Sequence, residues 1–82
     1  MANLRQQFGA RLRSIRHGRK LSQEEFAELV GISVDFLSLI ERGVSAPSFE
    51  VLEGMAKALR LPLKDFFDFK QVPTKLPRHV QR

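Results

Sequence analysis

Apolar residues recur along this chain at spacings of three and four, the period of one face of an α-helix. The first apolar stripe, over roughly residues 3–17, is formed by Leu4, Phe8, Leu12 and Ile15. Similar stripes cover residues 23–30, 33–42 and 48–59, and a short one lies near residues 63–67. The chain lacks the period-two alternation and the Asn-Gly or Asp-Gly turns that indicate strands and hairpins. The pattern therefore predicts an all-α fold, a compact bundle of five short helices.

The later stripes define the rest of the expected core. Its expected members are Phe26, Ala27, Leu29, Val30, Leu37, Ile40, Val51, Leu52, Met55, Ala56 and Leu59. The short fifth helix carries Leu63, Phe66 and Phe67, and one of its faces can enter the core. Serines and glycines mark the predicted helix ends, because serine caps helix N-termini and glycine favours the turn after a C-terminus. The expected N-caps are Ser22, Ser33 and Ser48, and the expected terminating glycines are Gly18, Gly31 and Gly43. Glu25, three residues after Ser22, completes a predicted capping box.

The turn between the second and third predicted helices consists of very few residues around Gly31. Glycine adopts positive φ at little cost, so the chain can turn sharply there. Ala27, four residues earlier, supplies a small side chain where two helix backbones would cross. The spacing predicts a helix-turn-helix pair crossed at ~90–120°, in preference to two unrelated short helices. The helix over residues 33–42 then projects in the way that lets such helices enter the DNA major groove.

Charge is distributed unevenly along the 82 residues, whose net charge is +5. Residues 1–23 carry six cations and no acid, residues 24–69 carry four cations and nine acids, and residues 70–82 carry four cations. Two interpretations stay open: a polyanionic partner, or a solvated basic face with a solubilising tail. We expect one helix-turn-helix domain over residues 1–69, followed by a basic, proline-containing tail over residues 70–82 that is extended or disordered.

Composition also bears on compartment and chemistry. The chain has no cysteine and no apolar run near the ~18 residues of a membrane span, so we expect a cytoplasmic protein without a membrane partner. His17 and His79 neighbour neither a plausible nucleophile nor a carboxylate at metal spacing. We therefore predict no enzyme, no catalytic residue, no metal and no cofactor. Only a short tail follows the predicted bundle, so no small-molecule effector is expected.

The segment LSQEEFAELVGISVDFLSLIERGVSAPS resembles the Xre-type, or phage repressor/Cro-type, helix-turn-helix regulators. The resemblance rests on L-S-Q-E-E, the spacing of Ala27 and Gly31, I-E-R-G, and the P-S that opens the next helix, and it extends over about residues 8–69. It implies a lambda-repressor-like five-helix fold, double-stranded DNA as ligand, a homodimer and transcriptional control. The protein would then be bacterial or phage-encoded and associated with the nucleoid.

The resemblance also implies roles for individual residues. The base-contacting positions would be Ser33, Val34, Asp35, Ser38 and Leu39. Gln23 and Arg42 match phosphate-contacting positions of the family. The other predicted phosphate contacts are Ser22 at the start of the second helix, Arg19 and Lys20 at the basic end of the first helix, and Ser45. Arg16 and Glu41 match a structural ion pair between the first and third helices.

The groove-facing positions are unusually apolar. The side chains of Val34 and Leu39 have no hydrogen-bonding group. They could instead contact the methyl groups of thymine. Leu39 has a second open role, in packing or a protein contact, and Phe36 is expected to pack at the edge of the helix. Asp35 either stabilises the helix N-terminus or accepts from a cytosine amino group, and Ser33 either only caps the helix or also contacts a base. We expect modest direct readout, with phosphates supplying much of the affinity.

Three phenylalanines, Phe66, Phe67 and Phe69, lie within four residues, and one short helix cannot bury them all. The excess predicts an apolar dimer interface, and cover by the C-terminal tail is the alternative. A homodimeric repressor is the simplest function, although activation is equally compatible. The acidic middle of the chain keeps a second function open: a protein-interaction module such as an antitoxin or a regulator-binding subunit.

Overall fold

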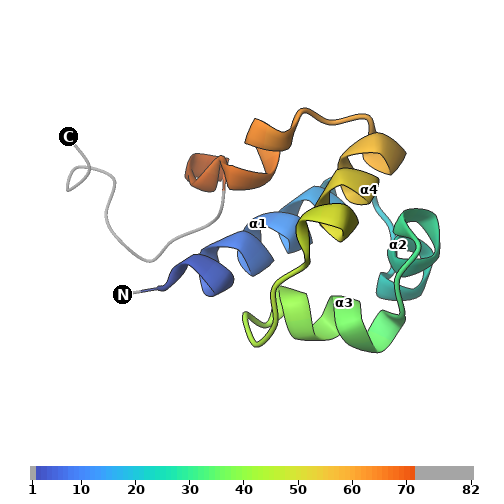
Figure 1. Cartoon of the computed structure of the whole chain (residues 1–82), viewed down its shortest axis with the longest axis horizontal. Coiled ribbons are helices and arrows are strands. Elements are labelled where there is room, and N and C mark those ends of the chain that lie inside the picture. Colours follow the sequence, from blue (N-terminus) through green and yellow to red (C-terminus); the bar gives the residue numbers. More distant parts are fainter. Residues whose placement is uncertain (1, 72–82) are drawn as a thin grey trace.

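The computed structural model describes residues 2–71, and this part of the chain contains no β-strand. Its elements are α1 (Leu4–Gly18), α2 (Gln23–Val30), α3 (Val34–Glu41), α4 (Phe49–Leu59), and the 3₁₀ segments η1 (Leu63–Phe67) and η2 (Phe69–Gln71) (Figure 1). The prediction of an all-α fold is confirmed. The predicted tail lies outside the described residues from residue 72 onward, and η2 carries regular structure to Gln71.

The count of five α-helices is wrong, because the fifth predicted helix is the 3₁₀ segment η1. Pro62 precedes it, and no side chain caps the segment. Only five residues separate Pro62 from Asp68, whose backbone leaves the helical region at ψ 83°. Short segments of this kind adopt i→i+3 hydrogen bonds more readily than a longer α-helical ladder.

The predicted caps form as expected. The Ser22 hydroxyl accepts from the Glu25 N–H at 3.0 Å, and the Glu25 carboxylate accepts from the Ser22 N–H at 2.8 Å, which confirms the capping box. Ser33 and Ser48 cap α3 and α4 in the same way. The end of α1 differs from the prediction. Gly18 is its last helical residue, and the left-handed residue after it is Lys20, with φ 60°.

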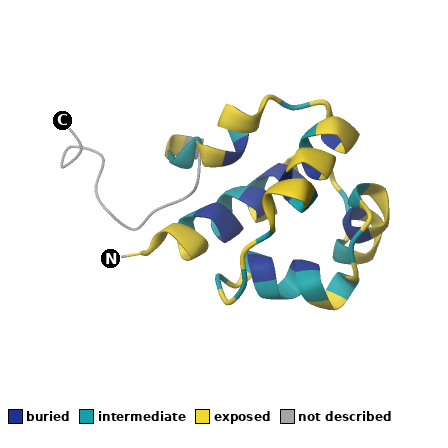
Figure 2. Cartoon of the chain, viewed as in Figure 1, coloured by how far each residue is buried: buried dark blue, intermediate teal, exposed yellow. Residues whose placement is uncertain are grey.

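The core lies where the four helices and η1 converge (Figure 2). Its buried apolar members are Phe8, Leu12, Ile15, Phe26, Ala27, Leu37, Ile40, Leu52, Met55, Leu59 and Phe66. Leu4 and Leu29 were expected on buried faces and are instead exposed. Leu63 and Phe67 of η1 are exposed as well. Helical spacing alone cannot show where an apolar stripe extends past the elements that pack against it. No described helix is long and apolar enough to cross a membrane.

The turn between α2 and α3 centres on Gly31, which has φ 81°. The N–H groups of Gly31 and Ile32 both donate to the Ala27 carbonyl, which closes the end of α2. A Cβ at Gly31 would meet nothing within 4 Å, so the backbone conformation and not a lack of space requires glycine. Figure 1 shows α2 and α3 running in different directions from this turn. Ala27 is buried at 3% exposure, in keeping with its predicted place in the packed pair.

Helix α1 packs closely against the end of α3 at Gly9. A Cβ built on Gly9 would lie 2.2 Å from the Ile40 carbonyl oxygen and 2.8 Å from that of Glu41. Only glycine fits there. The absence of a Cβ at residue 9 therefore allows the close approach of α3 to α1. The helical pattern gave no sign of this contact.

Candidate nucleic-acid interface

The outward face of α3 carries the predicted base-contacting residues. Ser33 and Asp35 are exposed, and Ser38 and Leu39 are half-buried. The Ser33 hydroxyl accepts from the Phe36 N–H at 3.0 Å, so it caps the helix, and its own hydrogen remains available to donate. The carboxylate of Asp35 lies in the first turn, where negative charge favours the helix dipole.

Two residues of α3 have roles that face inward. Val34, which the resemblance placed among base-contacting residues, is partly buried and packs against the hydrophobic core. Its contribution to a DNA surface is therefore smaller than expected, because part of its side chain is already in contact with the protein. Phe36 also packs against the core. Leu39 is half-buried but does not belong to the residues that pack on the core cluster.

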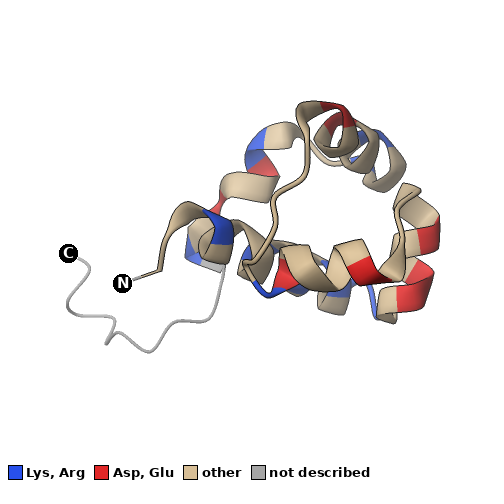
Figure 3. Cartoon of the chain, turned by 60° about the horizontal axis from the view of Figure 1, so that its bottom comes forward, with Lys and Arg blue, Asp and Glu red and all other residues tan. Residues whose placement is uncertain are grey.

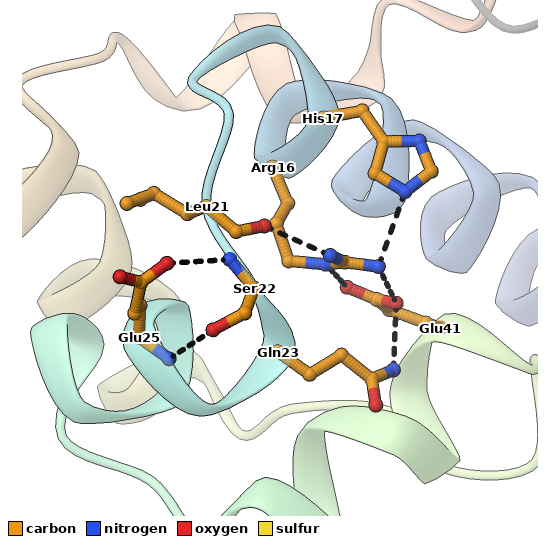
Figure 4. A network of polar contacts seen from close by, with 7 residues as sticks. All are labelled: Arg16, His17, Leu21, Ser22, Gln23, Glu25 and Glu41. Atoms are coloured by element: carbon orange, nitrogen blue, oxygen red, sulfur yellow. Dashed lines mark hydrogen bonds and ion pairs between the residues drawn. The ribbon is translucent and has the colours of Figure 1, made fainter.

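A buried polar network joins α1, α2 and α3 beneath this face (Figure 4). Arg16 Nε donates to Glu41 Oε2 at 2.7 Å, and Arg16 Nη2 donates to Glu41 Oε1 at 3.1 Å. The side chain of Glu41 is 3% exposed and that of Arg16 is 10% exposed. Arg16 Nη1 also donates to the carbonyl oxygen of Leu21, in the loop before α2, at 2.9 Å. The ion pair implied by the resemblance thus exists, and both of its side chains are almost completely shielded from solvent.

Gln23 is tied into the same network by its side chain. Its amide nitrogen donates to Glu41 Oε1 at 3.0 Å. An amide group has two N–H donors, so one stays available after this bond. Glu41 therefore fixes the rotamer of the residue that the family resemblance assigns to a phosphate contact. The sequence did not reveal this link between α2 and the end of α3.

A polar hollow of about 550 Å³ opens beside the network, between α1, α2 and α3. Its lining residues are Arg13, Arg16, Ser22, Gln23, Glu24, Ser38, Glu41 and Arg42. Within the described part of the chain, the exposed side chains of Arg13 and Arg42 have no hydrogen bond or ion pair. Three predicted phosphate contacts therefore line one hollow, namely Ser22, Gln23 and Arg42. Arg13, which was not among the predicted contacts, lines the same hollow. Arg13 lies one helical turn before Arg16, a spacing that could have indicated their shared face.

The remaining predicted phosphate contacts do not line this hollow. Arg19 Nη2 donates to the Leu59 carbonyl oxygen at 2.7 Å, which directs its guanidinium to the last turn of α4. Lys20 is exposed in the loop before α2. Ser45 is half-buried after α3, where its N–H donates to the Leu39 carbonyl at 3.2 Å. Figure 3 shows the acidic positions gathered mainly on α2 and α3 in this part of the molecule, with basic positions on α1.

The predicted dimer residues separate in the structure. Phe66 is completely buried, so its side chain belongs to the core and cannot form a surface patch. Phe67 is 43% exposed and Phe69 is half-buried, and their rings contact each other with centroids 6.2 Å apart. Phe67 also contacts Phe8, at a centroid distance of 5.4 Å.

An apolar groove of about 570 Å³ lies at this end of the molecule. Its lining residues are Asn3, Leu4, Arg5, Phe8, Ala46, Pro47, Phe49, Leu52 and Phe67. Phe49 is 83% exposed and Leu4 is 60% exposed, which is unusual for such large apolar side chains.

The described residues contain no group of three or more histidine, cysteine or acidic residues arranged to hold a metal ion.

Comparison with known proteins decides the family. A family model described as a helix-turn-helix domain matches residues 7–66, most of the described chain. The chain belongs to the Xre-type helix-turn-helix family. The family predicted from the L-S-Q-E-E and I-E-R-G segments is thereby confirmed.

Relatives in this family include a control protein of similar length. Control protein C.BamHI of Bacillus amyloliquefaciens is 35% identical over 71 residues, covering 85% of this chain and 88% of that protein. The restriction-modification controller C.AhdI of Aeromonas hydrophila has a similar structure, with a TM-score of 0.72 and 33% identity over 77% of this chain and 96% of that one. The HTH-type transcriptional regulator Rv0474 of Mycobacterium tuberculosis is 43% identical over 65% of this chain, but the match spans only 38% of that regulator.

Proposed function

We propose that the chain is a sequence-specific regulator of transcription that binds double-stranded DNA by inserting α3 in the major groove. The observation that carries the proposal is the exposed face of α3 beside a hollow in which Arg13 and Arg42 have no partner in the described residues. The Arg16–Glu41–Gln23 network holds α3 against α1 and α2, so the presented face is preorganised. The relatives named as regulators and controllers support the same function.

Sequence selectivity on this proposal comes from few base contacts. The face of α3 presents two hydroxyls, one carboxylate and one apolar side chain, from Ser33, Ser38, Asp35 and Leu39. Part of the Val34 side chain packs against the core. None of them supplies the two-pronged donor that reads guanine or the amide that reads adenine. Phosphate contacts therefore provide most of the affinity, and the phosphate contacts we propose are Ser22, Gln23, Arg42, Lys20, Ser45 and Arg19.

We expect the affinity for a duplex selected from random sequences to fall steeply with salt, with a log–log slope of about −0.9 per neutralised phosphate. Arg42→Ala and Gln23→Ala should each weaken binding, and Arg42→Ala should reduce the slope by about 1 per bound half-site. Fluorescence anisotropy over a range of salt concentrations measures both quantities. Lys57→Ala, on the exposed face of α4, is the matched control and should bind like the wild type. A wild-type slope near zero would refute the proposed function.

We further propose that the chain acts as a homodimer and, most simply, as a repressor that blocks polymerase. Two copies would place their α3 helices about one DNA turn apart, ~34 Å, on a palindromic site. The apolar groove supports this, because Leu4, Phe49 and Phe67 leave a contiguous apolar surface uncovered by described residues. Phe67 and Phe69 thus remain proposed interface residues, joined by Leu4 and Phe49. On this proposal the protein works at the nucleoid in the cytoplasm and has no enzymatic activity.

Replacing Phe49 by serine is expected to shift the protein from dimer to monomer at micromolar concentrations, because 83% of this ring is exposed and would be buried only in the dimer. The stability of the monomer should change little. Sedimentation equilibrium measures the shift. Leu29→Ser provides the control, since Leu29 is a 47% exposed apolar residue on α2 that does not line the groove. A wild-type chain that stays monomeric at high concentration, with and without DNA, would contradict the dimer.

The same groove also favours a second function, a protein-interaction module such as an antitoxin or a regulator-binding subunit. The acidic residues on α2 also favour this second function, because their negative charge repels DNA (Figure 3). A chain carrying both Gln23→Ala and Arg42→Ala separates the two functions. If DNA binding is the function, this variant loses it, whereas an interaction module would keep its partner.

A further inference from the structure

We infer that the polar hollow between α1, α2 and α3 seats one backbone phosphate of DNA, and that Arg13 is a direct contact to it. This inference rests on the proposed function and names a residue that neither the pattern of the sequence nor the family resemblance assigned. The hollow is lined from three helices, so a group bound there would contact α1, the start of α2 and the end of α3 together.

The charges around the hollow leave an anion favoured. Five charged residues line it: three arginines and two glutamates. Glu41 is neutralised by Arg16 within the buried network, at 2.7 Å. Glu24 is exposed at the start of α2 and has no ion pair among the described residues. Arg13 and Arg42 therefore exceed Glu24 by one positive charge, and no described residue uses the donors of their guanidinium groups, which can serve a bound oxyanion.

The backbone positions of Arg13 and Arg42 are fixed by contacts between α1 and α3. Arg13 lies on α1 one turn before Arg16, and Arg42 directly follows Glu41, so each is next to one member of the buried ion pair. The close contact at Gly9 further fixes α1 against the end of α3. Because both backbones are held, only the arginine side chains need to be ordered when a phosphate binds. Planar guanidinium groups suit this task, since they can donate to two phosphate oxygens at once.

The remaining polar groups of the hollow are compatible with a phosphate. Gln23 keeps one amide N–H after donating the other to Glu41, and the Ser38 hydroxyl lines the same hollow from α3. Glu24 is the opposing group, and it should weaken binding. The inference therefore predicts effects of opposite sign for two residues of one hollow: removal of the Arg13 charge lowers DNA affinity, whereas removal of the Glu24 charge raises it.

The experiment uses the full chain and a duplex selected by the wild-type protein from random sequences. Arg13→Ala is expected to lower affinity roughly tenfold per half-site and to reduce the salt slope by about 1, without changing the preferred sequence. Arg13→Gln should behave in the same way, and Glu24→Gln should bind more tightly than the wild type. Lys57→Ala is the control for loss of a distant cation. Thermal melting verifies that each variant is folded, as expected for exposed positions.

Neutral methylphosphonate groups, placed one at a time along each strand, identify the seated phosphate. At one position per half-site the substitution should weaken the wild type strongly and leave Arg13→Ala unaffected, because the contact is already lost. If Arg13→Ala binds as Lys57→Ala does, or if every methylphosphonate affects wild type and variant equally, the inference is overturned while the proposed function stands. If the wild type selects and binds no duplex, the proposed function fails and the inference fails with it.

Discussion

Replacing Glu41 by alanine is expected to lower the free energy of unfolding by about 3–5 kcal/mol, because it leaves the buried Arg16 cation without its partner. The carboxylate is 3% exposed and accepts three hydrogen bonds, two from Arg16 and one from Gln23. Water cannot replace these partners without opening the contact between α1 and α3. A small domain has only about 5–15 kcal/mol of stability in total, so the variant should be close to unfolding at physiological temperature.

Urea denaturation followed by circular dichroism measures this change. Glu53→Ala is the control, because Glu53 is an exposed glutamate on α4 and its loss should cost less than about 0.5 kcal/mol. The double variant Arg16→Met with Glu41→Leu should be more stable than either single variant, since it removes both charges and fills the space with apolar side chains. A Glu41→Ala chain within about 1 kcal/mol of the wild type would show that the pair contributes little.

The Glu41 variant should also lose DNA affinity beyond what its folded fraction explains. Gln23 would no longer be held by the carboxylate, so its amide would have to be ordered on binding. Glu41→Gln separates the two effects, because a glutamine at this position can still accept from Gln23 but cannot neutralise Arg16.

Replacing Gly9 by alanine is expected to destabilise the domain by about 2–3 kcal/mol, although alanine is the better helix former. The added Cβ would lie 2.2 Å from the Ile40 carbonyl oxygen, so α1 or α3 must move. Both clashing atoms belong to backbone, and no side-chain rotation can relieve the overlap. The shift would also disturb the Arg16–Glu41 pair, which bridges the same two helices.

Gly54→Ala is a matched control with the opposite expected sign. Gly54 lies within α4, is exposed, and a Cβ there would meet nothing within 4 Å. The same substitution should therefore stabilise the domain by about 0.5–1 kcal/mol through helix propensity alone. Thermal and urea denaturation of both variants give the comparison. If Gly9→Ala were as stable as Gly54→Ala, the close approach of α1 to α3 would not be required for folding.

The two positions together explain how the candidate interface is held. Gly9 sets the distance between α1 and the end of α3, and the Arg16–Glu41 pair sets their register. Arg13 and Arg42 lie beside these two fixed points. Loss of either contact should therefore weaken DNA binding even at temperatures where the chain remains folded, because the two arginines would no longer be held on one hollow.

Features that depend only on neighbouring residues could be predicted from the order of amino acids. Helix ends at Ser22, Ser33 and Ser48, and the sharp turn at Gly31, follow from hydrogen bonds and backbone angles within about four residues. The four α-helices were predictable for the same reason, and η1 was not, because helix and 3₁₀ segments share their apolar spacing over five residues. The family resemblance supplied the Arg16–Glu41 pair, which local spacing could not have given.

The packing of the helices sets which apolar residues stay exposed and which polar groups have no partner among the described residues. Phe49 and Leu4 are exposed, whereas Phe66 is buried, because burial depends on elements distant in sequence. The Gln23 amide is hydrogen-bonded to Glu41, 18 residues away, and Arg13, which has no partner among the described residues, lines the same hollow. Such relations are contacts between side chains of different helices, and they exist only once close packing has fixed the helices relative to one another.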